Sequence, residues 1–188
     1  MTSLFTTLLL AHLLGDFPFQ TNFIFKLKLR GGFYILPHVV IHVVLTAFLI
    51  QDWRTSWPIL LLLGIVHFAI DWFKVSKPLF SPDIDFIIDQ MMHLVSLVVL
   101  AYFFPLVEPV LPMSITLAGS ILALLPAFLM FSWVYALTQP KNEPMVIWMQ
   151  KSMCVFSQRT GQGIALGLLL VSVLVPVSYT HLTLPTIA

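Results

Sequence analysis

Charged residues are scarce in this sequence of 188 residues: Asp, Glu, Lys and Arg make up 9% of it, and hydrophobic residues make up 59%. A soluble domain carries about 25% charged residues. The composition therefore indicates an integral membrane protein whose main partner is the lipid bilayer. The formal net charge is only +1, and the basic residues are spread over short loops, so no basic patch for nucleic acid is present.

Cysteine is almost absent as well, since Cys154 is the single one. One cysteine excludes an internal disulfide, a metal–thiolate cluster and a redox pair. The N-terminus lacks the pattern of a signal peptide, because its first ten residues contain no Lys or Arg and His12 and Asp16 interrupt the apolar stretch. The chain also contains no P-loop, dinucleotide-binding fingerprint, GxSxG turn or HExxH helix.

Long apolar segments are what the chain does contain. Spanning a bilayer takes about 20 residues, and the candidate segments are residues 4–25, 33–50, 57–73, 82–104, 113–137 and the shorter 163–177. We therefore predict an all-α fold, a polytopic transmembrane bundle of five to six spanning helices. The polar stretch 138–162 fits either a loop or an amphipathic surface helix. Pro126 is expected to kink the fifth helix, and Ser81 and Pro82 suit the N-cap and first position of the fourth.

The distribution of Lys and Arg predicts the orientation of the bundle. Of the nine Lys and Arg residues, only Arg54 falls in the second or fourth loop. The first, third and fifth loops hold the others: Lys26, Lys28, Arg30, Lys74, Lys77, Lys141, Lys151 and Arg159. Because cytoplasmic loops are enriched in Lys and Arg, we expect the N-terminus outside and these three loops in the cytoplasm.

Five of the six histidines lie inside apolar segments, each with another polar residue one helical turn away. The four polar stripes are His12–Asp16–Gln20, His38–His42, His67–Asp71–Lys74 and Asp85–Asp89–His93. Residues four apart share one face of a helix, and ionisable groups in membrane helices usually face the bundle interior. In the predicted topology all four stripes fall in the cytoplasmic half of the bilayer. We therefore predict that eight of these side chains converge on one interior cluster: His12, Asp16, His38, His42, His67, Asp71, Asp89 and His93.

The residue types of this cluster suit a transition metal. Imidazole and carboxylate are ligands that Zn, Mn or Fe accept, and an i, i+4 histidine pair can chelate one ion. We expect a divalent ion, Zn or Mn, on His38 and His42, and the further metal-ligand candidates are His12, His67 and His93. The candidate catalytic residues are Asp16, Asp71 and Asp89, as general base or as additional ligands.

Two simpler interpretations of these residues stay open. Membrane helices use His and Asp as interhelical hydrogen-bond partners, and a buried His–Asp pair need not be functional. Lys74 can bind phosphate or pair with Asp16 or Asp89, but snorkelling to the headgroups is the favoured interpretation. Asp83 and Asp85 are expected to be helix-start residues rather than ligands.

Three functions are compatible with the pattern. The first is a metal-dependent membrane hydrolase or transferase acting on a lipid-like or phosphorylated substrate. The second is a transporter or channel for a divalent cation or protons, although the outer halves of the helices, such as residues 45–50 and 59–66, are almost wholly apolar. The third is a structural or partner-binding membrane protein whose polar layer only fixes helix packing. The substrate and the oligomeric state are not encoded in any visible pattern.

The four motifs together resemble a bacterial membrane family named domain of unknown function 3307. The motifs are HxxxDxxxQ from His12, HxxxH from His38, HxxxDxxK from His67 and DQxxH from Asp89. The resemblance covers about residues 4–100 and implies a multi-span protein of the bacterial cytoplasmic (inner) membrane. It implies no particular activity.

The motifs also suggest how the chain is organised. Residues 1–104 are expected to form a four-helix core that carries the His and Asp motifs, and residues 105–177 to add membrane helices with a polar connecting segment. Residues 178–188 break the hydrophobic pattern without a charge or a cap and resemble translated sequencing-adapter sequence. We expect this tail to be non-native, and His181 is therefore left out of the site.

Overall fold

Helices make up nearly all of the described chain. The computed structural model describes residues 1–140 and 143–182, with side chains described as far as residue 170 apart from 169. In order, the elements of these residues are α1 Thr2–Asp16, α2 Asn22–Lys28, the 3₁₀ helix η1 Gly32–Ile35, α3 Leu36–Leu49, α4 Trp57–Ser76, α5 Pro82–Phe103, α6 Met113–Thr138 and α7 Pro144–Leu182. The predicted all-α class is confirmed.

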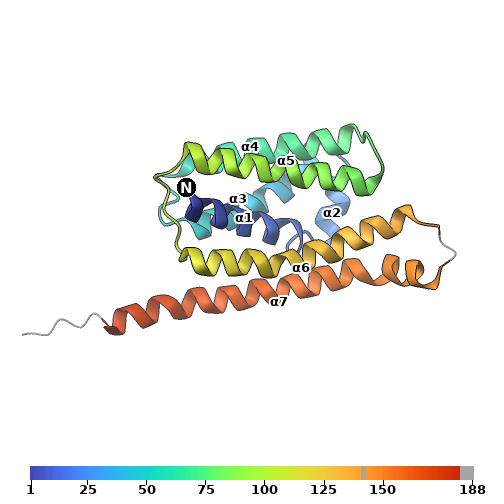
Figure 1. Ribbon diagram of the computed structural model, residues 1–188. Helices are drawn as coiled ribbons and strands as arrows, with labels where there is room; N and C mark the ends of the chain where they lie inside the picture. The colour runs from blue at the N-terminus through green and yellow to red at the C-terminus, as the bar shows by residue number, and fades with distance from the viewer. Residues whose placement is uncertain (141–142, 183–188) are drawn as a thin grey trace, which may run out of the picture.

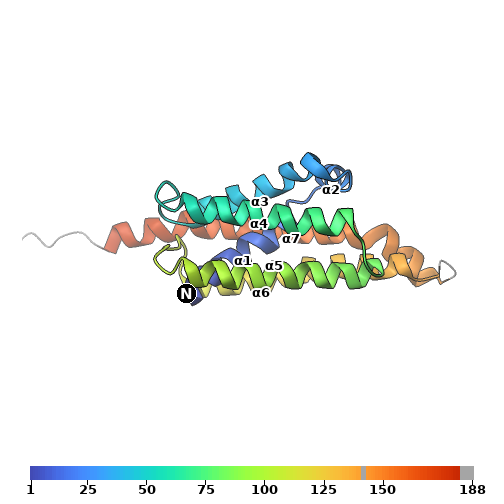
Figure 2. The ribbon, with the colours of Figure 1, turned by 90° about the horizontal axis from the view of Figure 1, so that it is seen from above.

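Helix α1 is the central element of the bundle. Helices α3, α4, α5 and α6 contact one another in chain order, and α1 packs against α3, α5 and α6. In Figure 1 the α4–α5 hairpin lies on one side of α1, and α6 and α7 lie on the other; in the view from above in Figure 2, α5 therefore overlaps α6. Because α1 is enclosed, eleven of its fifteen residues are buried, which places its polar side chains in the interior.

The prediction that residues 4–25 form one spanning helix is wrong. Helix α1 ends at Asp16, and a second helix, α2, starts at Asn22 after a break that contains Pro18. A proline ring collides with the carbonyl group one turn earlier and offers no N–H, so the helix cannot continue through this position. At 1.5 Å per residue, α1 is about 22 Å long, which is shorter than the hydrocarbon core of roughly 30 Å.

Four helices of the described chain are long and apolar enough to span a bilayer, fewer than the five to six predicted. They comprise η1 with α3 (Gly32–Leu49), α4, α5 and α6. The expected short span at 163–177 and the polar stretch before it belong to one continuous helix, α7. The side chains of 171–177 lie outside the described residues, as does part of the tail expected to be non-native. The domain boundary at residue 104 stays a prediction.

Prolines begin three of the spanning helices. Pro37, Pro58 and Pro82 each stand in the first turn of α3, α4 and α5, where the missing N–H has no partner to lose and the fixed φ suits a helix. Ser81 occupies the N-cap position of α5 as predicted, but its side chain makes no capping hydrogen bond. Asp83 and Asp85 lie in the first turn of α5, as helix-start residues do.

Helix α7 is fastened along α6 by hydrogen bonds to carbonyl groups. Pro126 lies inside α6, and its carbonyl accepts a hydrogen bond from the Ser157 hydroxyl at 2.6 Å. The Trp133 indole donates to the carbonyl of Gln150 at 2.9 Å, and the Gln150 amide donates back to Ala136 at 2.7 Å. Figure 1 shows α6 changing direction about half-way along, as predicted from the proline.

Apolar side chains fill the end of the bundle at which α1 begins. One core cluster there joins the start of α1 to the end of α3, the start of α4 and the end of α5: Leu4, Leu8, Ile50, Ile59, Leu60, Leu63, Leu97, Leu100 and Ala101. The polar stripes lie beyond this cluster, towards the opposite end. The bundle is thus divided along its length into an apolar half and a half with a polar interior.

The described surface allows a direct test of orientation. With Trp53 54% exposed and Lys77 also exposed, single cysteines at these positions in a Cys154→Ser background are accessible to a thiol reagent. We expect an impermeant maleimide to label Trp53→Cys in intact spheroplasts, and Lys77→Cys only after lysis, because the Lys-rich loops are predicted to be cytoplasmic. Labelling of Lys77→Cys alone in intact spheroplasts would reverse the assignment.

Candidate metal centre

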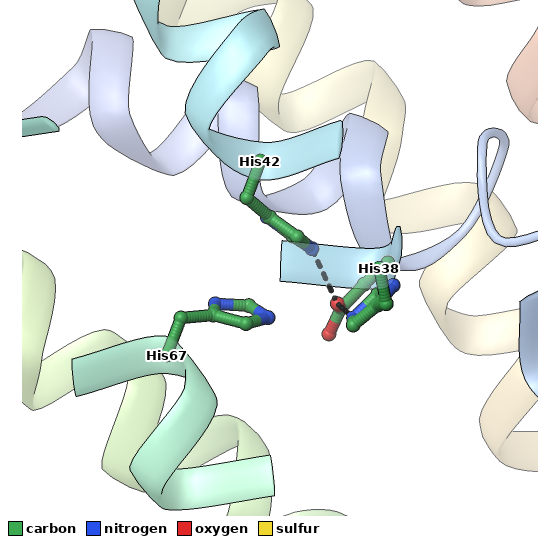
Figure 3. A group of neighbouring side chains, drawn as sticks. His38, His42 and His67 are labelled. Atoms are coloured by element: carbon green, nitrogen blue, oxygen red, sulfur yellow. Dashed lines mark ion pairs between the residues drawn. The ribbon is translucent and has the colours of Figure 1, made fainter. Parts of the chain in front are cut away.

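The structure brings together all eight His and Asp side chains singled out in the sequence. Each is at most 5% exposed, and they come from four helices: His12 and Asp16 from α1, His38 and His42 from α3, His67 and Asp71 from α4, and Asp89 and His93 from α5. The closest rings, those of His42 and His67, have centroids 3.8 Å apart. Figure 3 shows His38, His42 and His67 directed towards a common point.

The Asp16 carboxylate lies between the two histidines of α3. Its Oδ1 is 3.1 Å from Nε2 of His38 and 3.1 Å from Nε2 of His42. Within α1, by contrast, His12 Nε2 is 3.6 Å from Asp16 Oδ2. The nearest partners of this carboxylate are therefore on another helix, as expected from the skew of neighbouring side chains on one helix. Because His38 and His42 are four residues apart on α3, both rings point to the same oxygen of Asp16.

Helices α4 and α5 supply a second group that adjoins the first. Asp71 Oδ2 is 3.5 Å from His67 Nε2 and 3.6 Å from His38 Nε2. The His93 ring has its Nδ1 2.9 Å from the backbone carbonyl of Asp89, so Nδ1 carries the proton and donates. Its Nε2 is then left with a free lone pair, directed to within 4.0 Å of Asp71 Oδ1. An imidazole oriented in this way is the usual form of a metal-binding histidine.

The first of these groups fits a metal ion. Asp16, His38, His42 and His67 each offer one ligand atom, and the four atoms lie within 4.8 Å of one another. Ligand atoms around a tetrahedral ion with bonds of about 2.0–2.1 Å are roughly 3.3 Å apart. Nε2 of all three histidines and Oδ1 of Asp16 are buried, yet they make no hydrogen bond of good geometry with the described residues. Such atoms lie close together but do not have the angles of a hydrogen bond. This arrangement is expected when the atoms point to a shared centre rather than to each other.

Two lysines that sequence reasoning treated as loop charges belong to this interior. Lys28, at the end of α2, is buried and its Nζ lies 2.6 Å from Asp71 Oδ1. Lys74 Nζ lies 2.6 Å from Asp89 Oδ2, so its favoured interpretation as a snorkelling residue is wrong and the alternative pairing with Asp89 is correct. Burial works against the charge of Lys28, but the attraction of Asp71, Asp16 and Asp89 outweighs it and raises the pKa of this amine.

Gln90 is a further residue whose role the sequence did not reveal. Its amide nitrogen donates to Asp16 Oδ2 at 2.7 Å, and its amide oxygen lies 3.4 Å from His12 Nε2. It thereby joins α5 to α1 and holds the second oxygen of Asp16 away from the His38–His42 side. The only sign of this role in the sequence is that Gln90 stands between Asp89 and His93 in the DQxxH motif. A glutamine in such a position has no spacing pattern of its own that would predict its partners.

The charges of the cluster do not balance. Asp16, Asp71 and Asp89 contribute three negative charges and Lys28 and Lys74 two positive ones, which leaves −1 with the five imidazoles neutral. An uncompensated charge in a low-dielectric interior is costly. One additional proton brings this sum to zero, whereas a divalent cation changes it to +1.

Comparison with known proteins agrees with the motifs. The model of one protein family, described as "Protein of unknown function (DUF3307)", matches residues 4–121, more than half of the chain. The match runs past the motifs and into α6, beyond the region of about 4–100 that the resemblance covered. No curated protein and no solved structure matches this chain.

The close approach of α1 to α3 generates a prediction at Gly15. A Cβ added there would lie 2.4 Å from Cε1 and 2.6 Å from Nδ1 of His42, so Gly15→Ala must displace the ring. We expect a loss of roughly 1–3 kcal/mol, as in other overpacked interiors, measured as a lower Tm in detergent. Gly163→Ala is the matched control, because a Cβ there meets nothing within 4 Å; equal Tm values for the two variants would contradict the geometry.

The ion pair between Lys28 and Asp71 generates a second prediction. Lys28→Met leaves a buried carboxylate without its partner, which costs on the order of 3 kcal/mol, or roughly 6–12 °C in Tm for a chain of this size. The exposed Lys26 on the same helix supplies the control, Lys26→Met, for which we expect no measurable change. Adding Asp71→Asn to Lys28→Met should restore part of the loss, because no charge is then left unpaired; a further loss would show that the pair is not the cause.

Proposed function

We propose that this chain, which belongs to the DUF3307 family of proteins of unknown function, is a metal-dependent membrane hydrolase or transferase acting on a lipid-like or phosphorylated substrate. The observation that supports it most is the convergence of Asp16, His38, His42 and His67, whose ligand atoms lie within 4.8 Å of one another from three helices. The proposed orientation, with the N-terminus outside the bacterial inner membrane, puts this site in the cytoplasmic leaflet.

The donor set favours zinc or manganese. Three imidazoles and one carboxylate suit either ion, and the chain offers no thiolate there that would favour a softer metal. His93 and His12 are the remaining metal-ligand candidates: His93 presents a free Nε2, whereas His12 lies beside Gln90.

In the proposed chemistry the three carboxylates have different roles, which follow from their positions. A divalent ion supplies Lewis-acid polarisation and a more acidic bound water. Asp16 lies in the ligand group, whereas Asp71 adjoins it, with Oδ2 3.5–3.6 Å from His67 and His38. Asp71 is therefore placed to hold a proton next to the reacting water, as a general base does, and Lys28 fixes its other oxygen. Asp89 is the carboxylate that positions Lys74.

The transporter interpretation has less support. A cation or proton path needs polar groups along the full length of the bundle. Beyond the site, the described residues around the start of α1 form an apolar cluster in which Leu8, Ile59 and Leu97 are at most 1% exposed. A purely structural polar layer remains the main alternative, and metal content distinguishes it from the proposed centre.

The metal is tested by elemental analysis of protein purified in detergent without a His-tag or chelator. We expect about one Zn or Mn per chain in the wild type, and less than about a tenth of that in the His38→Ala/His42→Ala variant, since two of four ligands are removed. Val40→Ala/Val44→Ala is the matched control, because these two residues have the same spacing on α3 but are 54% and 43% exposed, and we expect it to keep the metal. Sub-stoichiometric metal in the wild type, or equal metal in wild type and double variant, would leave the hydrogen-bonded layer as the better account.

A further inference from the structure

We propose that a cavity beside the polar cluster binds an amphipathic phosphomonoester, with its phosphate at the Lys74 end and its hydrocarbon along the apolar wall. This names a substrate class for the proposed hydrolase or transferase and rests on that proposed function. The cavity has a volume of about 520 Å³, within the range of roughly 300–1,000 Å³ of sites for small organic ligands. It lies between the ends of α1, α4 and α6 and the start of α5.

The inner end of the cavity adjoins the polar cluster. Asp16, a proposed ligand, lines it, as do Lys28, Lys74, Asp89 and Gln90. A molecule in the cavity therefore contacts the edge of the polar cluster, while the three proposed histidine ligands lie behind Asp16. Gln20 also lines the cavity, and its buried Oε1 makes no hydrogen bond with the described residues, which leaves an acceptor for a ligand hydroxyl.

The remaining walls are apolar and largely aromatic. They are lined by Phe17, which directly follows α1, by Phe25 from α2 and Phe86 from α5, and by Met130 and Trp133 from α6. A small hydrophilic ligand would leave these rings without apolar contacts. A wholly apolar ligand would leave the remaining N–H donors of Lys74 and the Oε1 of Gln20 without a polar partner, which is costly. A ligand with one polar end and a hydrocarbon body satisfies both parts of the cavity.

The charges identify the polar end as an anion. With a divalent ion bound, the −1 of the cluster becomes +1. Lys74 has three N–H donors and uses one on Asp89, while its side chain is 29% exposed towards the cavity. Its Nζ is held 5.5 Å over the Phe86 ring. A lysine placed beside a metal ion is a common arrangement for binding phosphate oxygens.

Binding is tested by calorimetry on the detergent-solubilised, zinc-loaded protein with three probes. Dioctanoyl phosphatidic acid carries both features, dioctanoylglycerol lacks the phosphate, and inorganic phosphate lacks the chains. We expect dioctanoyl phosphatidic acid to bind at least tenfold more tightly than either of the others. Equal binding of dioctanoylglycerol would refute recognition of the phosphate, and equal binding of inorganic phosphate would refute use of the apolar wall.

Two substitutions on α6 test the location. Leu137 is 47% exposed and lines the cavity, whereas Leu125 is 52% exposed on the same helix and does not. We expect Leu137→Trp to weaken binding of dioctanoyl phosphatidic acid at least tenfold and Leu125→Trp to leave it unchanged; an equal effect of the two would place the ligand elsewhere. Zinc content is measured on the same samples. Full zinc with no effect of Leu137→Trp overturns the cavity proposal alone, and a wild type that holds neither zinc nor manganese overturns the proposed function.

Discussion

The rest of this structure depends on how the negative charges of three buried carboxylates are compensated inside an apolar bundle. Burial removes most of the water that would solvate them, so partners must come from the protein. Asp16 is held by two histidines of α3 and by Gln90 of α5, Asp71 by Lys28, and Asp89 by Lys74. Each of these partners lies on a different helix from the carboxylate that it compensates. The same contacts that compensate the charges therefore also hold the helices together.

This requirement explains why a short helix occupies the centre of the bundle. Helix α1 does not need the length of a spanning helix, because its neighbours cover it. Its side chains Leu4 and Leu8 join the apolar core, and those of His12 and Asp16 enter the polar cluster. The Thr6 hydroxyl meets that of Thr116 on α6 at 2.7 Å, a hydrogen bond of the kind that helps to join membrane helices. The break at Pro18 then frees the chain to turn and bring Lys28 back to Asp71.

The sequence predicted the cluster but not all of its members. Polar residues spaced four apart on an apolar segment form a stripe on one face of a helix, and in a membrane helix this face must avoid lipid. This argument was enough to predict that the eight His and Asp residues face the interior. The break after Asp16 was missed because residues 4–25 remain apolar on both sides of Pro18. Lys28 was missed because a lysine in a basic loop normally reaches water, and only the three-dimensional position of Asp71 shows that it does not. The roles of these residues remain proposals.

The apolar cluster at one end of the bundle affects how molecules can enter and leave the site. Among the described residues, the cluster around Leu8, Ile59 and Leu97 closes the polar interior on one side, while the cavity adjoins it on the other. In the described part of the chain, the site is therefore open on the side of the cavity. If the proposed reaction takes place there, its product leaves through the opening by which the substrate enters, and the two compete for that opening.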